Sequence, residues 1–240
     1  MRSCAITQPT YLPWPGFWNL MATADQFVFL DDVQFQRNSW HCRNQILLSG
    51  HAVFLTVPVR RTGLDTPLSD AQIDYNQNWR KSHEGQIRQA YSRTPGGPLI
   101  IDVLCDAWIN RPKRLLDLNL KIIKSLSNLL EIETPLLCSS SLDISGKRSE
   151  RVYKICKYLH ADSYLSPAGS AEYLADDKFD ELGGVTLHLQ DFISRVYPQH
   201  QALDFFSHLS VVDLIANLGV KGVSEYVRYP SFTDLTSETE

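Results

Sequence analysis

The chain has 240 residues, and 27 Asp and Glu against 23 Lys and Arg give a formal net charge of −4. This mild acidic balance excludes a general attraction to nucleic acid or anionic membrane, although a local basic patch stays open. No window approaches the roughly 20 apolar residues that span a bilayer. Residues 1–9 meet polar residues and proline almost at once, unlike a signal peptide, so we expect a cytoplasmic protein without membrane insertion.

The cysteines also favour a cytoplasmic protein. The five cysteines are odd in number, widely spaced and mostly set in apolar contexts, which predicts reduced thiols rather than a disulfide framework. No pair has metal-ligand spacing, so we expect no metal site.

The first elements form a strand, loop, helix and strand. Residues 4–7 are a short apolar run typical of a buried strand, and the following loop carries three prolines that forbid a helix. Helical spacing then runs from Phe17 to Ala24, and residues 26–30 are rich in β-forming apolar residues. A parallel pair of strands joined by a crossover helix is therefore predicted at the start of the chain.

Polar and aromatic side chains crowd the segment that follows the second strand. In open α/β sheets, ligands bind beyond the carboxyl ends of the strands. We therefore expect these residues to converge on one pocket: Gln8, Tyr11, Asp31 or Asp32, Gln34, Arg43 and Asn44.

Each of these residues also has a structural interpretation. Gln8 can cap the next helix, an aspartate can pair with Arg43, and Asn44 can satisfy a turn. The aromatic residues Trp14 and Phe17 can simply be core.

The middle of the chain reads as a strand and a set of helices. A strand is predicted at 52–59, and the basic turn at 60–61 fits either a phosphate clamp or a solvated hairpin. A helix beginning at Trp79 places His83 and Ile87 on one face and carries several cations. Helices at 99–108 and 114–130 follow, so residues 79–130 predict a small helical subdomain.

A second strand, loop, helix and strand covers residues 134–166. Its serine-rich loop leads to a helix that opens with Lys147, Arg148 and Arg151, where free amide donors and positive charge suit an anion. Cations in a first helical turn oppose the dipole, and this local conflict points to function. A loop of small residues follows Ser166.

The end of the chain predicts a strand at 185–189 and an amphipathic helix at 205–218 ended by Gly219. Asp213 on this helix either approaches a site or bonds a neighbouring backbone group. We expect one domain over residues 1–228 and a polar, disordered tail at 229–240.

These elements predict an α/β fold with a mainly parallel central sheet and helices on both faces. Right-handed crossovers place the loops after Thr7, Leu30, Cys138 and Ser166 on one edge. The loops at 11–17 and 166–170 resemble the nucleotide-binding arrangement of nucleotidyltransferase-like, Rossmannoid folds. The histidines diagnostic of those enzymes are absent, which favours nucleotide-type binding rather than adenylyl transfer.

The chain resembles the WbqC-like family of bacterial proteins over nearly its whole length. The resemblance rests on the run from Gln8 to Phe17, on Asp31 to Phe35, on Ser39-Trp40 and Arg43-Asn44, and on several stretches downstream. It implies a context of O-antigen and related surface-polysaccharide synthesis. One departure is His41-Cys42, where the family shows Gln-Asn, and this weakens any role that needs those two side chains.

Two functional classes follow. The first is a transferase acting on a nucleotide-diphosphate sugar, through acyl or aminoacyl transfer to an amino sugar, with His83, Asp31 or Asp32 as base. The predicted substrate-binding residues are Gln8, Tyr11, Trp14, Gln34, Arg43, Asn44, Arg148, Arg151 and Ser166. The second class is a non-catalytic sugar- or nucleotide-binding assembly factor of the same pathway. The sequence assigns no cofactor and no oligomeric state.

Overall fold

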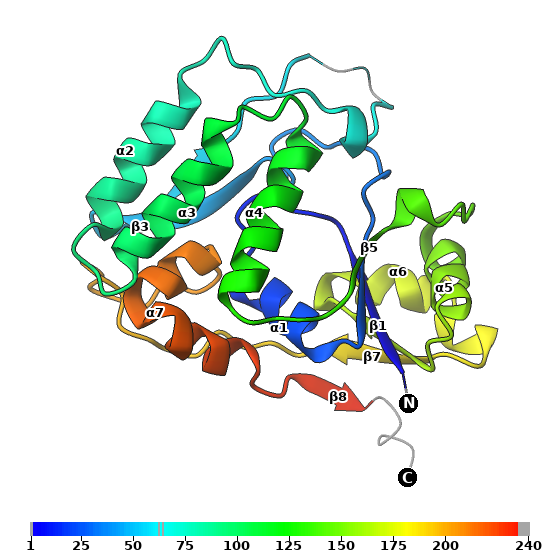
Figure 1. Cartoon of the computed structure of the whole chain (residues 1–240). Helices are drawn as coiled ribbons and strands as arrows, with labels where there is room; N and C mark the ends of the chain where they lie inside the picture. Colours follow the sequence, from blue (N-terminus) through cyan, green and yellow to red (C-terminus); the bar gives the residue numbers. More distant parts are fainter. Residues whose placement is uncertain (1, 62, 64, 235–240) are drawn as a thin grey trace.

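The computed structural model describes residues 2–61, 63 and 65–234, and a six-stranded sheet lies at its centre (Figure 1). The strand order is β5-β2-β1-β6-β7-β8, in which the first five strands are parallel and β8 runs antiparallel to β7. This confirms the predicted α/β fold with a mainly parallel sheet. The strands of this sheet are β1 (Ser3–Thr7), β2 (Gln26–Phe29), β5 (Leu136–Cys138), β6 (Ser163–Ser166), β7 (Thr186–Gln190) and β8 (Phe232–Asp234).

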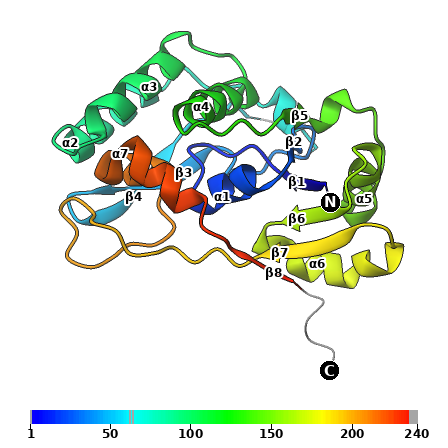
Figure 2. The same cartoon turned by 60° about the horizontal axis from the view of Figure 1, so that its bottom comes forward.

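Helices cover both faces of the sheet because side chains along each strand alternate between two apolar clusters. In β1, Cys4 and Ile6 pack with α5 and α6, whereas Ala5 packs with α1 and α7 on the other face. Figure 2 shows α1 and the α5–α6 pair on opposite sides of the sheet. The helices are α1 (Pro15–Thr23), α2 (Trp79–Tyr91), α3 (Gly97–Ile109), α4 (Leu115–Leu129), α5 (Arg148–Tyr158), α6 (Ala171–Asp176) and α7 (Val211–Val227).

The strand order creates a switch point between β1 and β6. The chain leaves β1 toward α1 on one face and leaves the neighbouring β6 toward α6 on the other. The loops that diverge here form the usual ligand crevice of an open α/β sheet. The parallel registers also bring the ends of β1, β2, β5 and β6 to one edge, as predicted.

A separate hairpin joins the sheet to the helical part of the chain. Strand β3 (Arg43–Leu48) pairs antiparallel with β4 (His51–Thr56), with Asn44 opposite Leu55. The pattern analysis predicted only the second of these strands. Helices α2, α3 and α4 lie side by side (Figure 1), within the region predicted to be helical, and α2 packs against β3.

The closing helix corrects one prediction. It begins at Val211 rather than at residue 205, because the Ser210 hydroxyl caps it by accepting the Val212 N–H at 3.2 Å. The first helical segment ends at Gly219, as predicted, because a φ of 70° and a ψ of 174° take this residue out of the helical conformation. A second helical segment then follows the kink and continues to Val227.

The predicted tail needs a correction as well. Residues 232–234 form β8, because Phe232 packs against the main apolar cluster and this segment pairs with β7. Residues 229–231 form no helix or strand, and residues 235–240 lie outside the described residues.

The side chain of Asp213 is buried and makes its hydrogen bonds to other side chains of the protein. Its buried carboxylate accepts hydrogen bonds from Tyr91 Oη at 2.8 Å and Tyr197 Oη at 2.7 Å. Burial raises the pKa of this carboxyl group, although the tyrosine hydrogen bonds oppose the rise. Asp213 therefore ties α7 to α2 and to the segment after β7.

Across the described part of the chain, no helix has the length and apolar character to cross a membrane. The five cysteines are all free thiols. No group of three or more His, Cys, Asp or Glu among the described residues is placed to hold a metal ion.

Candidate functional site: an aromatic pocket at the end of β1

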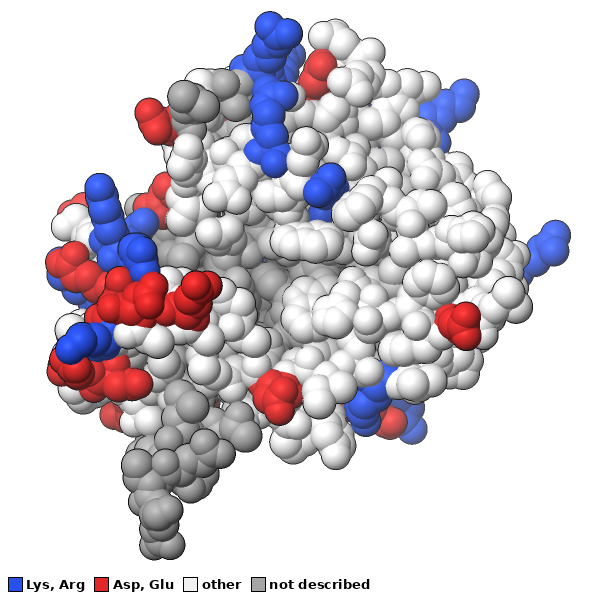
Figure 3. Space-filling view, turned by 180° about the vertical axis from the view of Figure 1, so that it is seen from behind, with Lys and Arg blue, Asp and Glu red and all other residues white. Residues whose placement is uncertain are grey.

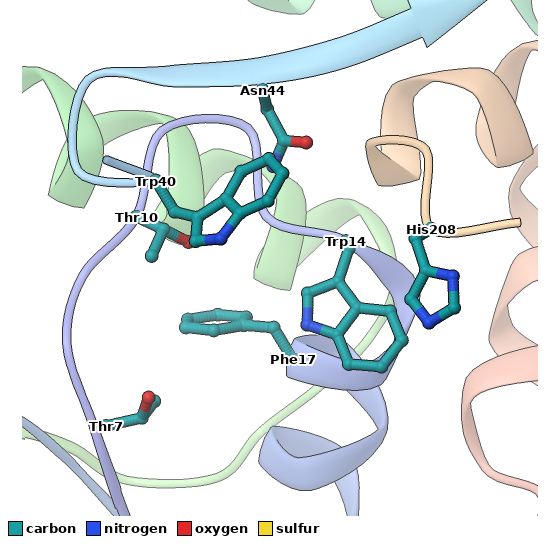
Figure 4. Close-up of a pocket in the computed structure, with 7 residues that line it drawn as sticks. All are labelled: Thr7, Thr10, Trp14, Phe17, Trp40, Asn44 and His208. Carbon is teal, nitrogen blue, oxygen red and sulfur yellow. The ribbon is translucent and has the colours of Figure 1, made fainter. Parts of the chain in front are cut away.

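A pocket of about 220 Å³ lies beyond the carboxyl end of β1. Figure 4 shows three aromatic side chains around an open space, with two threonines beside it and an asparagine above it. The lining residues are Thr7, Thr10, Trp14, Phe17, Trp40, Asn44 and His208. Seen from behind, the molecule is hollowed near the centre of a face that carries mostly uncharged side chains (Figure 3). We call the space between these seven residues the aromatic pocket.

Trp14 forms one wall because of the residues around it. Pro15 starts α1 with its φ already suited to a helix, and Gly16 leaves room for the indole to fold back over the helix start. A Cβ at Gly16 would lie 2.2 Å from Trp14 Cζ2. The indole also stacks on His208, with ring centroids 5.2 Å apart and planes inclined by 22°. The loop before α1 and the segment before α7 thus meet at this wall.

Four polar groups of the pocket are unused by the protein. Within residues 2–61, 63 and 65–234, the hydroxyls of Thr7 and Thr10 and the indole N–H groups of Trp14 and Trp40 have no hydrogen-bond partner. In Figure 4 the indole nitrogens of both tryptophans face the open space. Hydroxyls donate and accept, whereas indoles only donate. The pocket therefore offers flat apolar surfaces together with donors and acceptors that a bound molecule can use.

The loop at residues 8–14 is held from behind by buried polar side chains. Asn44 Nδ2 donates to the carbonyl of Leu12 at 2.8 Å and to that of Tyr11 at 3.2 Å. Asn119 Nδ2 on α4 donates to the carbonyl of Pro9 at 3.2 Å and to that of His41 at 2.8 Å. Leu12 has a φ of 47°, a strained conformation for a leucine that persists only when neighbours hold it. These contacts fix the pocket wall before any ligand arrives.

The predicted residues Tyr11 and His83 belong to this support. Tyr11 Oη lies 3.1 Å from His83 Nδ1, and the imidazole lies in the core between α2 and α3 against Trp79 and Trp108. Burial lowers the pKa of His83 to about 4, so this side chain is neutral near pH 7. His83 does not line the pocket.

Gln8 supports the loop at residues 36–41, which carries Trp40 of the pocket. Its Oε1 lies 2.6 Å from His41 Nε2, while His41 Nδ1 accepts a hydrogen bond from the Gln36 N–H at 3.4 Å. Nε2 therefore carries the proton and donates it to Gln8. Burial lowers the pKa of His41 to about 4. This neutral imidazole occupies one of the two positions at which the sequence departs from the family pattern.

Asp31 and Asp32 form a different cluster, at the ends of β2 and β5. Asp31 accepts hydrogen bonds from Ser140 Oγ at 2.6 Å, Ser140 N at 3.0 Å and Ser139 Oγ at 3.1 Å. Asp32 accepts from Ser139 Oγ at 2.7 Å and pairs with Arg151. Burial raises the pKa of Asp32, but the hydrogen bonds from Arg151 and Ser139 outweigh burial and leave it below its usual value. We call these five residues the aspartate cluster.

The remaining predicted residues belong neither to the pocket lining nor to the aspartate cluster. Arg148 pairs with Asp177 at 3.0 Å beside α6, and Gln34 forms an isolated β-bridge with Pro67. Ser166 is fully buried at the end of β6, and Arg43 lies over the ring of Phe54 on the hairpin.

Of the predicted residues, Trp14 and Asn44 line the pocket. Three others support the loops around the pocket: Gln8 contacts His41, and Tyr11 contacts His83. The aspartate cluster contains Asp31, Asp32 and Arg151.

Sequence reasoning did not select five of the seven lining residues. The sequence context of Phe17 indicates a core residue, and Trp40 is one of several aromatic residues after β2 with no signal of its own. Thr7 and Thr10 flank Gln8 and Pro9 in the first strand and loop, which is a signal that could have found them. His208 reaches the pocket only through the tertiary path of the segment before α7.

Fold and site together define an α/β protein with an aromatic pocket beyond the carboxyl end of β1. The family model of the WbqC-like protein family matches residues 8–225, and the chain belongs to this family. It is similar to "Uncharacterized protein Rv1507c" of Mycobacterium tuberculosis (strain ATCC 25618 / H37Rv), with 28% identity over 233 residues that cover 95% of this chain and 99% of that protein. No solved structure matches the chain significantly.

Proposed function

We propose that the protein is a transferase that acts on an activated sugar and seats one sugar ring in the aromatic pocket. The observation that carries this proposal is the combination of three aromatic walls with four unpaired polar groups. A sugar ring has C–H faces that pack on aromatic rings and hydroxyls that need donors and acceptors around its edge. Membership of the WbqC-like family supports surface-polysaccharide synthesis as the setting.

The size of the pocket supports a single ring. Its volume of about 220 Å³ lies below the roughly 300–1,000 Å³ of pockets that enclose drug-sized ligands. A complete nucleotide sugar would therefore extend beyond the pocket. The nucleotidyltransferase-like character of the fold stays a prediction, and so does the cytoplasmic location.

The chemical step proposed for this site is acyl or aminoacyl transfer to an amino sugar. Of the three predicted bases, His83, Asp31 and Asp32, we favour Asp32, because its side chain is 31% exposed whereas the other two residues are buried. A specific observation favours the alternative, a non-catalytic binding factor: His208 is the one ionisable side chain among the seven that line the pocket. Binding without turnover fits a pocket of that composition.

The first experiment measures affinity for a panel of nucleotide sugars and free sugars by calorimetry. Trp14→Ala should weaken binding about tenfold or more, because a lost aromatic stack removes roughly 1 kcal/mol or more. Tyr158→Ala is the control, since Tyr158 on α5 is 59% exposed and outside the pocket. The melting temperature of both variants shows whether the fold is intact.

The second experiment separates the two classes. Incubation of the protein with bound sugars and acyl thioester or aminoacyl donors, followed by mass spectrometry, should yield a covalent product if the protein is a transferase. Saturable binding without product supports the binding factor. Equal affinity of wild type and Trp14→Ala for every sugar in the panel would refute the pocket assignment.

A further inference from the structure

Arg43 differs from the other two arginines among the predicted substrate-binding residues, Arg148 and Arg151. Arg148 and Arg151 pair with Asp177 and Asp32, so carboxylates already neutralise their charges. Within the residues that the structure describes, the Arg43 side chain has no ion pair and no hydrogen-bond acceptor. Its contact is with an aromatic face, since the guanidinium carbon lies 4.4 Å from the centroid of the Phe54 ring.

This contact connects Arg43 to the aromatic pocket. Phe54 lies 6.1 Å from Trp40, centroid to centroid, and Trp40 is a wall of the pocket. Trp40 and Phe54 are 51% and 43% exposed, so a ligand can reach both. Trp40, Phe54 and Arg43 therefore form a continuous strip from the pocket wall onto the hairpin.

The register of the hairpin explains why the strip has this direction. Arg43 is opposite Thr56 and Phe54 is opposite Gln45, which puts Arg43 and Phe54 diagonally across one face of the two strands. Asn44, the next residue of β3, points to the other side and lines the pocket. Asn44 therefore faces the pocket from one side of the hairpin, whereas Arg43 lies on the opposite side.

We propose that Arg43 binds the phosphate of a glycosyl phosphate or nucleotide-diphosphate sugar whose sugar ring occupies the aromatic pocket. This inference rests on the proposed function and names the part of the ligand that lies outside the pocket. The guanidinium over the Phe54 ring donates to no acceptor among the described residues, so its N–H groups are available to two phosphate oxygens. The pocket lining contains no Lys or Arg, so a phosphate inside it would have no permanent positive charge to offset its desolvation. The ring enters and the phosphate remains outside, at Arg43.

The test compares pairs of ligands that differ only in the phosphate. Hexoses and N-acetylhexosamines are titrated by calorimetry, each as the free sugar and as the 1-phosphate, with wild type, Arg43→Gln and Arg111→Gln. Arg111 is the matched control, because its guanidinium also lies over an aromatic ring, 4.7 Å from the centroid of Tyr75, but away from the pocket lining.

Arg43→Gln should lower affinity for the 1-phosphates about tenfold or more and leave affinity for the free sugars unchanged. It should also flatten the dependence of phosphate-sugar affinity on salt concentration, since a screened charge pair is lost. Arg111→Gln should change neither ligand class. Melting temperatures measured alongside separate lost binding from lost folding.

Two results overturn the inference in distinguishable ways. Wild type that binds both ligand classes, with Arg43→Gln weakening both equally or neither, refutes the role of Arg43 and leaves the sugar pocket standing. Wild type that binds no member of the panel refutes the pocket proposal and this inference together.

Discussion

The aspartate cluster and the aromatic pocket lie on the same edge of the sheet but differ in how their polar groups are used. In the cluster, Asp31 accepts three hydrogen bonds and Asp32 pairs with Arg151, so its carboxylates are bonded within the protein. In the pocket, two hydroxyls and two indole N–H groups have no partner among the described residues. Charged residues that satisfy one another stabilise loops, whereas unpaired polar groups beside aromatic walls are available to a ligand.

The largest effect that tests this comparison is expected from Asp31→Ala. The change removes a buried carboxylate and leaves the hydroxyl and the backbone N–H of Ser140 without their acceptor. Unfolding free energy should fall by about 3–5 kcal/mol, measured as a lower urea midpoint at constant slope. The exposed Asp204→Ala should change it by less than about 0.5 kcal/mol. A stable Asp31→Ala protein that loses sugar binding would instead make the cluster part of the site.

The second prediction concerns the histidines behind the pocket. Burial lowers the pKa of both His41 and His83 to about 4, from about 6.5 in the unfolded chain. Below pH 6.5 the unfolded state binds protons that the folded state does not, so stability is complete above that pH and is lost as pH falls toward 4. Each imidazole should account for a loss on the order of 3 kcal/mol.

Urea titrations of wild type and His83→Gln between pH 7 and pH 4 measure this loss. The glutamine keeps an acceptor for Tyr11 but does not titrate, so the variant should lose stability less steeply with falling pH. Parallel curves for the two proteins would show that His83 is not held neutral by the fold.

The smallest of the three effects is expected from Asn44→Ala. The substitution leaves the buried carbonyls of Tyr11 and Leu12 unpaired, which should cost about 1–3 kcal/mol. Sugar affinity should fall as well, because the strained loop at Leu12 loses its support. Asn128→Ala is the matched control, since Asn128 is an exposed asparagine on α4. Unchanged affinity in Asn44→Ala would show that the loop keeps its shape without this side chain.

Much of the architecture could be predicted from the sequence because the signals are local. The apolar run before Pro9 and the periodic stripe of α4 specify β1 and a core helix without reference to the rest of the chain. The missed strand β3 shows the limit: its polar residues Arg43, Asn44 and Gln45 hide the strand pattern, and pairing with β4 stabilises it. The late start of α7 has a different cause: the cap at Ser210 sets the first turn of the helix and outweighs the apolar residues that precede it.

For the site, the sequence by itself determined that polar and aromatic residues gather after β1 and β2, because parallel strands bring those loops to one edge. Only the tertiary structure decided which residues meet there. Asp32 finds Arg151 from 119 positions away, and Trp14 stacks on His208 from the far end of the chain. A side chain has a hydrogen-bond partner or lacks one only after distant segments pack together. The difference between a saturated cluster and an open pocket is therefore a property of the fold, and sequence spacing does not encode it.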